Sequence, residues 1–345
     1  MTKLKDFLRQ WRLALGKWVL DKKVTEYNSV SSPKSILFLR QDGKIGDYIV
    51  SSFVFREIKN FDSSIKVGVV CSRQNAYLFE KNPHIDQLYF VKKKSIVDYI
   101  KNGLKISKQG YDLVIDPTIM LRNRDLLFLR LIGAKNYLGY LKKDYKLFDL
   151  NLLQTDIHFS EIYRQALEKV GIPVKSMQYD VPFSKKERNE ILQFLQKNQI
   201  QNYLAINFYG AASSRKFSDE NIKKILHYLQ NQKADRKIII LGYPEVNEKL
   251  KNIASYFSNV FVYDIQNIFH TIELIRYCEQ LISPDTSTIH IASGFNKPII
   301  GIYSQDQVNF NHWKPTSTTV NILFYEKNIN EIFPEQLLEE WFKNK

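Results

Sequence analysis

The residues best suited to chemistry are gathered at positions 281–292, which read L-I-S-P-D-T-S-T-I-H-I-A. This pattern predicts the end of an apolar strand, a polar turn, and a helix capped by Asp285, Thr286 or Ser287. The start of such a helix has unpaired N–H groups and partial positive charge, which suit an anion such as a diphosphate. His290 lies one turn beyond Thr286 and faces the same side. Taken alone, the stretch fits a capped helix with a core histidine equally well.

A second polar group occupies the loop at 208–217, F-Y-G-A-A-S-S-R-K-F, which follows an apolar run at 203–207. The loop ends on two hydroxyls and two cations: Ser213, Ser214, Arg215 and Lys216. Small residues allow close backbone approach, while hydroxyl donors and fixed positive charge suit phosphate. The loop is therefore a candidate phosphate site, although the two serines could equally be plain loop residues.

A third polar loop follows the apolar run at 35–40 and contains Gly43 and Gly46 before Asp47. Open α/β sheets bind ligands at the carboxyl ends of their strands, where such a loop would lie. The pattern is not G-x-G-x-x-G, so the dinucleotide fingerprint is absent. Asp47 is either a helix-capping carboxylate or a catalytic one.

Strand and helix patterns alternate along most of the chain, which predicts an α/β protein with doubly wound parallel sheets. An extended segment with prolines at 171–182 suggests a boundary between two such domains. The expected organisation is an amphipathic helix and linker at 1–34, Rossmann-like domains at 35–178 and 179–328, and a helix at 329–345 returning to the first domain.

Composition narrows the class of protein. The 345 residues are too many for one ordinary core, and 44% hydrophobic with 25% charged residues is typical of a globular protein. Cys71 and Cys278 lie far apart in apolar segments, and no Cys/His cluster has zinc spacing, so we expect buried thiols and no metal. No apolar run could span a bilayer and no signal peptide is evident, which favours a cytoplasmic protein.

The net charge of +14 calls for an anionic partner. No nucleic-acid motif is present, so nucleic acid is not expected. Residues 3–23 predict a helix whose apolar stripe includes Trp11 and Trp18 among lysines and arginines. This combination fits a helix lying in an anionic membrane interface. The alternative is that the same stripe packs on the protein's own surface.

Together these features resemble the heptosyltransferases of lipopolysaccharide core synthesis, glycosyltransferase family nine, which have the GT-B fold. The stretch 283–292 is similar to the family's S-x-D-T-G-x-x-H-x-A, I-G-D at 45–47 to its I-G-D, and G-Y-P-E at 242–245 to its G-x-P-E. Two departures stand out. Ser287 replaces the family's glycine, and Arg215 takes the place of the lysine in its Lys-x-Trp-Pro.

The resemblance implies an inverting transfer of heptose from ADP-L-glycero-D-manno-heptose to Kdo, or phosphorylated Kdo, of the lipid A inner core. It implies no metal or cofactor, and peripheral attachment to the cytoplasmic face of the inner membrane. Asp47 would be the general base. The donor would be bound by Ser213, Ser214, Arg215, Lys216, Glu245 (on the ribose hydroxyls), Asp285, Thr286, Ser287 and His290. The acceptor would be bound by Arg40, Lys44, Arg122 and Arg124.

Two alternatives remain open at this stage. One is a related GT-B transferase that uses another nucleotide sugar or adds an outer-core sugar. The other is a nucleotide-binding polysaccharide-assembly protein that has lost transfer, against which the presence of Asp47 argues.

Overall fold

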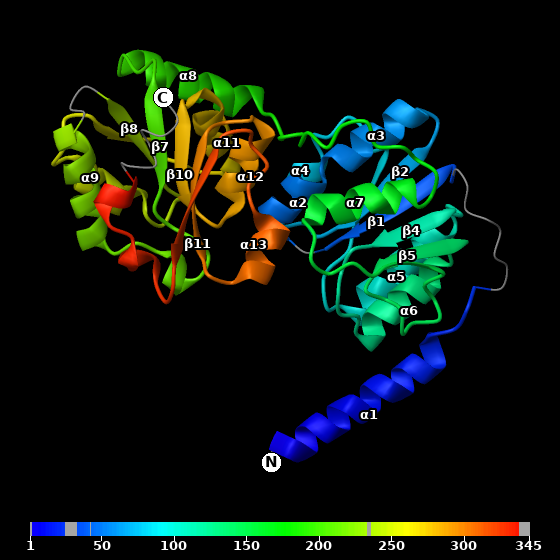
Figure 1. The fold of residues 1–345 in the computed structure, drawn as a ribbon. Coiled ribbons are helices and arrows are strands. Elements are labelled where there is room, and N and C mark those ends of the chain that lie inside the picture. The colour runs from blue at the N-terminus through cyan, green and yellow to red at the C-terminus, as the bar shows by residue number, and fades with distance from the viewer. Residues whose placement is uncertain (1, 25–32, 42, 233–235, 338–345) are drawn as a thin grey trace. The chain divides into compact units, whose positions relative to one another are not determined.

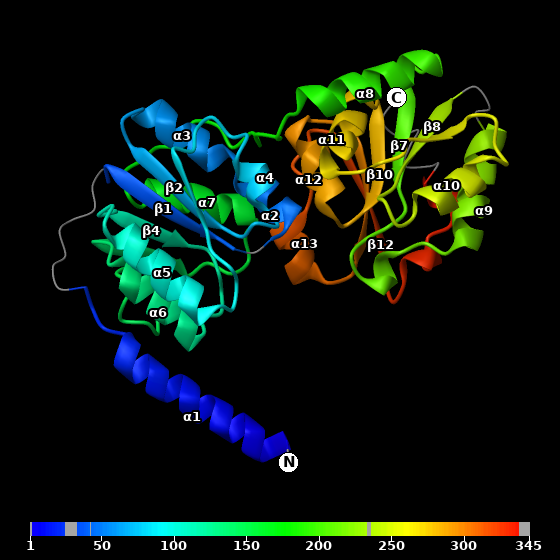
Figure 2. The same cartoon turned by 180° about the vertical axis from the view of Figure 1, so that it is seen from behind.

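The computed structural model describes residues 2–24, 33–41, 43–232 and 236–337 (Figures 1 and 2). The chain divides into two compact units, Met1–Met177 and Gln178–Lys345. The boundary expected from the sequence, between residues 178 and 179, differs from this division by a single position.

The first unit is built on a six-stranded sheet in the order β3-β2-β1-β4-β5-β6, with every pair parallel. The strands are β1 (Ser35–Arg40), β2 (Lys66–Cys71), β3 (Gln87–Phe90), β4 (Leu113–Asp116), β5 (Asn136–Tyr140) and β6 (Leu150–Leu152). The helices after α1 are α2 (Ile45–Ser51), α3 (Phe53–Phe61), α4 (Ala76–Phe79), α5 (Ile96–Ser107), α6 (Asn123–Ile132) and α7 (Phe159–Glu168). Side chains of α5 and α6 pack in one core with Leu37 and Leu39 of β1. The short strand β6 was not predicted.

The second unit has a six-stranded parallel sheet in the order β12-β11-β10-β7-β8-β9. The strands are β7 (Tyr203–Asn207), β8 (Lys237–Leu241), β9 (Val260–Val262), β10 (Gln280–Pro284), β11 (Ile299–Ser304) and β12 (Val320–Tyr325). The helices are α8 (Lys185–Lys197), α9 (Asp219–Gln232), α10 (Asn247–Ala254), α11 (Ile268–Tyr277), α12 (Ser287–Gly294) and α13 (Gln307–Trp313), with short 3₁₀ turns η1 (Ser213–Arg215) and η2 (Ile329–Glu331). Neither β12 nor α13 was predicted. The doubly wound parallel architecture itself is confirmed.

The segment after β12 requires a correction. Residues 329–345 were expected to return to the first domain, but Ile329, Ile332 and Leu337 pack in the core of the second unit. These three side chains are almost fully buried there, because they cover the sheet face that carries Ile300 and Ile302. Residues 338–345 of the predicted helix lie outside the described residues.

The N-terminal helix α1 (Thr2–Leu20) contacts α6 (Figure 1). Asn123 Nδ2 donates to the Arg12 carbonyl at 2.7 Å, and the backbone N–H of Leu147 donates to Asp21 Oδ1 at 2.9 Å. A Cβ at Gly16 would lie 2.0 Å from Asn123 Nδ2, so glycine permits the close approach. The docked face is Leu13, Gly16, Lys17 and Leu20, whereas Trp11, Leu15 and Trp18 stay exposed. Within residues 11–20, the stripe residues Trp11, Leu15 and Trp18 are therefore not the surface by which α1 packs on this unit.

Cys71 in β2 and Cys278 after α11 are buried, as predicted, and burial raises the pKa of each thiol to about 12. In the described ranges, no helix has the length and hydropathy needed to cross a bilayer. The same ranges hold no cluster of three or more His, Cys, Asp or Glu side chains suited to a metal ion.

Each sheet has one point where the strand order reverses. In the first sheet this point lies between β1 and β4, and in the second between β7 and β10. Doubly wound sheets bind ligands outside the carboxyl ends of the strands at such a point. The loops after β1, β7 and β10 are the three polar stretches identified in the sequence.

Candidate active site

The carboxyl edge of the second sheet gathers the loops that follow β7, β8, β10 and β11. Because all four strands are parallel, these loops leave the sheet at the same edge. The predicted donor residues of the loop at 208–217, the turn at 242–245 and the start of α12 therefore belong to one region of the second unit. The three predicted segments thus lie at the same edge of the sheet, and donor binding by their residues stays a prediction.

An ion pair between Arg215 and Asp285 lies at the centre of this region. Arg215 Nη1 donates to Asp285 Oδ2 at 2.6 Å and to the Asp285 carbonyl at 3.2 Å. Asn309 Nδ2 of α13 donates to the same carboxylate oxygen at 3.0 Å. Burial raises the pKa of Asp285, while the charge of Arg215 and the bond from Asn309 oppose that rise. Asp285 thus orients Arg215, a role not predicted from the sequence, where Asp285 was assigned to the donor sugar.

Gly210 explains how the loop places Arg215 there. The Gly210 N–H donates to the Arg215 carbonyl at 2.7 Å, which closes the loop on itself. A Cβ at position 210 would lie 2.5 Å from Arg215 Cβ, so only glycine fits this approach. The Phe208 and Phe217 rings meet edge to face at 5.7 Å and fix the two ends of the loop.

The remaining polar residues of this loop line its exposed side. Ser213 and Lys216 are exposed, and Ser214 is partly buried. Burial raises the pKa of Tyr325 at the end of β12, while the charge of Arg215 and the donors of Arg215 and Ser214 lower it. Ser213 and Lys216 can therefore meet a ligand from solvent, whereas Ser214 and Arg215 are held against the sheet edge.

The start of α12 is fixed by a hydrogen-bonded network beneath it. Ser283 Oγ lies 2.7 Å from Thr288 Oγ1, and Asn207 Nδ2 lies within 3.3 Å of both hydroxyl oxygens. This network joins β7, β10 and α12 at the point where the strand order reverses. Thr286 is the N-cap residue, and Thr286 and Ser287 are partly exposed. Their backbone N–H groups are placed to meet an anion.

His290 is buried inside the second unit. Its side chain is 4% exposed, and its ring lies 5.6 Å from the ring of Trp313 on α13. These surroundings are those expected for a core histidine, the alternative that the sequence left open. The ring contact with Trp313 shows that His290 supports α12 from within, and donor binding by His290 stays a prediction.

Glu245 lies on the exposed turn after β8. The turn is held next to the loop at 208–217 because the Tyr243 ring packs edge to face on the Tyr209 ring at 5.8 Å. Glu245 makes no hydrogen bond or ion pair with the residues that the structure describes. Its carboxylate is thus available to a ligand at this edge.

Asp47 lies in the first unit, in the first turn of α2. Lys44 occupies the N-cap position, so Asp47 is the third residue inside the helix and is not its cap. The Asp47 side chain is partly exposed, and its carbonyl accepts a hydrogen bond from Ser51 Oγ at 2.8 Å. The position is compatible with a base at the carboxyl edge of β1.

Arg40 was predicted to bind the acceptor, but it is fully buried. Its guanidinium donates to Ser51 Oγ in α2 and lies 5.5 Å from the ring of Tyr163 in α7. Arg40 therefore joins β1 to two helices and is a structural residue. An arginine at the end of a strand pattern is expected at the solvent-exposed edge of the sheet. The sequence alone did not indicate that Arg40 is buried.

The structure does not bring the other three basic candidates into one group. Lys44 is exposed at the start of α2. Arg122 and Arg124 line a pocket at the start of α6, and neither Lys44 nor Arg40 belongs to that pocket.

Sequence reasoning missed two buried titratable residues at or just after the ends of the neighbouring strands β4 and β5, Asp116 and Lys142. Asp116 ends β4, and burial raises the pKa of its carboxyl group, an effect that the charge of Lys142 opposes. Burial likewise lowers the pKa of Lys142. The Lys142 ammonium donates to the carbonyls of Tyr140 at 3.0 Å and Ile119 at 3.2 Å. Lys142 therefore holds the loop between β4 and α6.

The two Rossmann-like units, each a six-stranded parallel sheet with helices, have the architecture of the GT-B glycosyltransferases. The model of glycosyltransferase family 9 (heptosyltransferase) matches residues 101–339, and the chain belongs to this family. The chain is similar to the Escherichia coli K12 protein named "Putative lipopolysaccharide heptosyltransferase 4", with 23% identity over 286 residues, 80% of this chain and 77% of that protein.

Solved structures share the fold. The family 9 glycosyl transferase from Veillonella parvula DSM 2008 has a TM-score of 0.74 at 16% identity, covering 92% of this chain and 98% of its own. The E. coli ADP-heptose lps heptosyltransferase II has a TM-score of 0.70 at 13% identity, covering 89% and 97%.

Proposed function

We propose that this glycosyltransferase moves heptose from ADP-L-glycero-D-manno-heptose to Kdo, or phosphorylated Kdo, of the lipid A inner core during lipopolysaccharide synthesis. The observation that carries the proposal is the Arg215–Asp285 pair just before α12, at the same sheet edge as the exposed carboxylate of Glu245. The names of two relatives, a putative lipopolysaccharide heptosyltransferase and an ADP-heptose lps heptosyltransferase, support ADP-heptose as the donor and lipopolysaccharide as the class of acceptor.

The proposed reaction is an inverting displacement. The acceptor hydroxyl attacks the anomeric carbon, Asp47 takes the hydroxyl proton, and the bond from that carbon to the diphosphate oxygen breaks. Negative charge then grows on the leaving ADP. Arg215, Lys216 and the N–H groups of Thr286 and Ser287 would stabilise that charge. Ser213 and Ser214 would add hydroxyl donors, and Glu245 would accept hydrogen bonds from the ribose. A metal ion is not part of this scheme.

The test is transfer by the purified full chain with ADP-heptose and Kdo-lipid A, with and without phosphate on the Kdo. We expect mass spectrometry to show the acceptor gaining one heptose and the other product to be ADP. Gain of a different sugar from another nucleotide-sugar donor would favour the related-transferase alternative. ADP binding without transfer to either acceptor would favour a protein that has lost catalysis.

We also propose that α1 attaches the enzyme to the cytoplasmic face of an anionic membrane. Trp11 and Trp18 are 64% and 79% exposed although α1 is docked by its other face. Indole rings and aliphatic side chains beside basic residues enter the interfacial region of anionic bilayers. The net charge of +14 adds long-range attraction to such a surface.

The double substitution Trp11→Ser and Trp18→Ser is expected to weaken co-sedimentation with phosphatidylglycerol vesicles by about tenfold or more, because two large apolar side chains no longer enter the bilayer. The matched control is Tyr256→Ser with Phe333→Ser, which removes two aromatic side chains of similar exposure from the second unit. Equal binding by both double variants would show that α1 serves the fold alone.

A further inference from the structure

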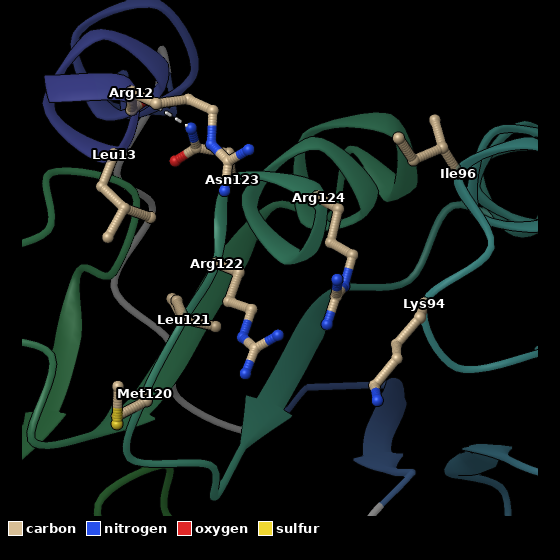
Figure 3. Close-up of a pocket in the computed structure, with 9 residues that line it drawn as sticks. All are labelled: Arg12, Leu13, Lys94, Ile96, Met120, Leu121, Arg122, Asn123 and Arg124. Carbon is tan, nitrogen blue, oxygen red and sulfur yellow. Dashed lines mark hydrogen bonds between the residues drawn. The ribbon is translucent and has the colours of Figure 1, made fainter. Parts of the chain in front are cut away.

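A pocket of about 540 Å³ lies in the first unit between α1 and the start of α6 (Figure 3). Its walls come from three segments distant in sequence: α1, the turn that leads into α5 together with its first residue, and the loop after β4 together with the first turn of α6. The volume is within the range of about 300–1,000 Å³ that is typical of small-molecule sites. A simple inorganic ion would fill only a fraction of it.

The pocket is lined by four cations and no acid: Arg12, Lys94, Arg122 and Arg124. Figure 3 shows the charged ends of Lys94, Arg122 and Arg124 pointing into the same space. Arg12, Lys94 and Arg122 form no ion pair with any residue in the described part of the chain. Arg124 has one carboxylate neighbour, Asp125, at 3.7 Å. Mutual repulsion between unneutralised cations favours an anion among them.

Two backbone features add to this preference. Helix α6 begins at Asn123, so the positive end of a ten-residue helix opens on the pocket. Lys94 has a φ of 72°, which places it in the left-handed region that a lysine rarely adopts. The Ser95 N–H donates to the Lys92 carbonyl at 3.2 Å and closes the turn that holds Lys94 in this conformation.

Apart from Asn123, the rest of the lining is apolar and open to solvent. Leu13, Ile96, Met120 and Leu121 complete the walls, and Ile96 and Met120 are 55% and 74% exposed. Helix α5 continues this surface outward with a row of exposed apolar side chains at Val97, Ile100 and Leu104. A small hydrophilic anion would leave this apolar surface in water. An anionic amphiphile would cover it.

We propose that this pocket binds the phosphate monoester of a lipid-linked sugar, with the cations on the phosphate and the apolar rim against the acyl chains. A phosphate monoester carries close to two negative charges, and guanidinium groups bind phosphate oxygens in a bidentate fork. The inference rests on the proposed function in one respect, namely that the lipid is the glycosyl acceptor. It assigns the pocket to the lipid part of that acceptor rather than to the sugar that is glycosylated.

The test compares binding to vesicles of one part phosphatidic acid to four parts phosphatidylcholine with binding to phosphatidylglycerol vesicles of matched surface charge. Phosphatidic acid presents a phosphate monoester and phosphatidylglycerol a diester. We expect the full chain to prefer the monoester vesicles. The double substitution Lys94→Gln with Arg122→Gln is expected to lower binding to those vesicles by about tenfold and to remove the preference. Both side chains are exposed, so the fold should persist, which circular dichroism would check.

The matched control is Lys169→Gln with Lys175→Gln, which removes two exposed cations from the same unit away from the pocket. If this control loses as much binding as the pocket variant, the attraction is general and the proposal fails. Inorganic phosphate is added as a competitor. If it binds the protein with the same affinity as the phosphatidic acid vesicles, the apolar rim plays no part and the proposal fails. No sugar donor is present, so failure here leaves the transfer reaction standing. Loss of transfer with an intact monoester preference would count against the proposed function alone.

Discussion

Replacing Asp47 by asparagine is expected to lower kcat for heptose transfer by about a hundredfold to ten-thousandfold, the range typical of a lost general base. An amide has nearly the shape of the carboxylate but cannot accept the acceptor's proton. Asp47 lies inside α2 rather than at its N-cap, so its removal takes no cap from that helix. Transfer rates at saturating donor and acceptor measure the effect.

ADP binding separates this result from misfolding. The proposed donor residues all belong to the second unit, so the dissociation constant of ADP should be unchanged in the Asp47→Asn protein when measured by calorimetry. Asp144→Asn serves as the matched control, because Asp144 is exposed in the same unit and no hydrogen bond or ion pair joins it to the described residues. Retention of most activity by Asp47→Asn would overturn its assignment as the base.

The two-domain α/β architecture could be predicted because short runs of apolar residues mark the central strands. The runs ending at Arg40, Asn207 and Pro284 are buried central strands, and such strands need continuous hydrophobicity. Strand β6 was missed because three residues are too few to form a pattern. Strand β12 is apolar in sequence but lies at a sheet edge and is mostly only partly buried, and nothing in its sequence explains why it was missed. Helix α13 has seven residues with none of them buried, so it carries no periodic apolar face to detect.

The candidate site was predicted in part for a related reason. Local motifs located Arg215, Asp285 and Glu245 at one sheet edge, because parallel strands fix where their loops emerge. The partner of Asp285 on α13, Asn309, lies 24 positions along the chain, and no local pattern joins the two. The burial of Arg40 and His290 depends on packing between elements, which a single sequence does not reveal.

Replacing Arg215 by alanine is expected to raise the dissociation constant of ADP by about tenfold to a hundredfold, the size expected for lost hydrogen bonds to a charged group. Arg215→Lys keeps the charge but loses the bidentate fork, so a smaller loss of affinity is expected. An unchanged dissociation constant in the alanine variant would remove Arg215 from the donor site.

The same substitution has a second effect, on stability, because it leaves the buried carboxylate of Asp285 with Asn309 as its remaining partner. Burial already raises the pKa of Asp285, and loss of the opposing Arg215 charge raises it further. A carboxyl group whose folded pKa exceeds its unfolded pKa binds protons more tightly in the folded state, so stability falls as pH rises through that window. The melting temperature of Arg215→Ala should therefore drop more at neutral than at mildly acidic pH. Adding Asp285→Asn should restore stability at neutral pH without restoring ADP affinity, which separates the two roles of Arg215. Recovery of ADP affinity in that double variant would show that the arginine serves only to neutralise Asp285.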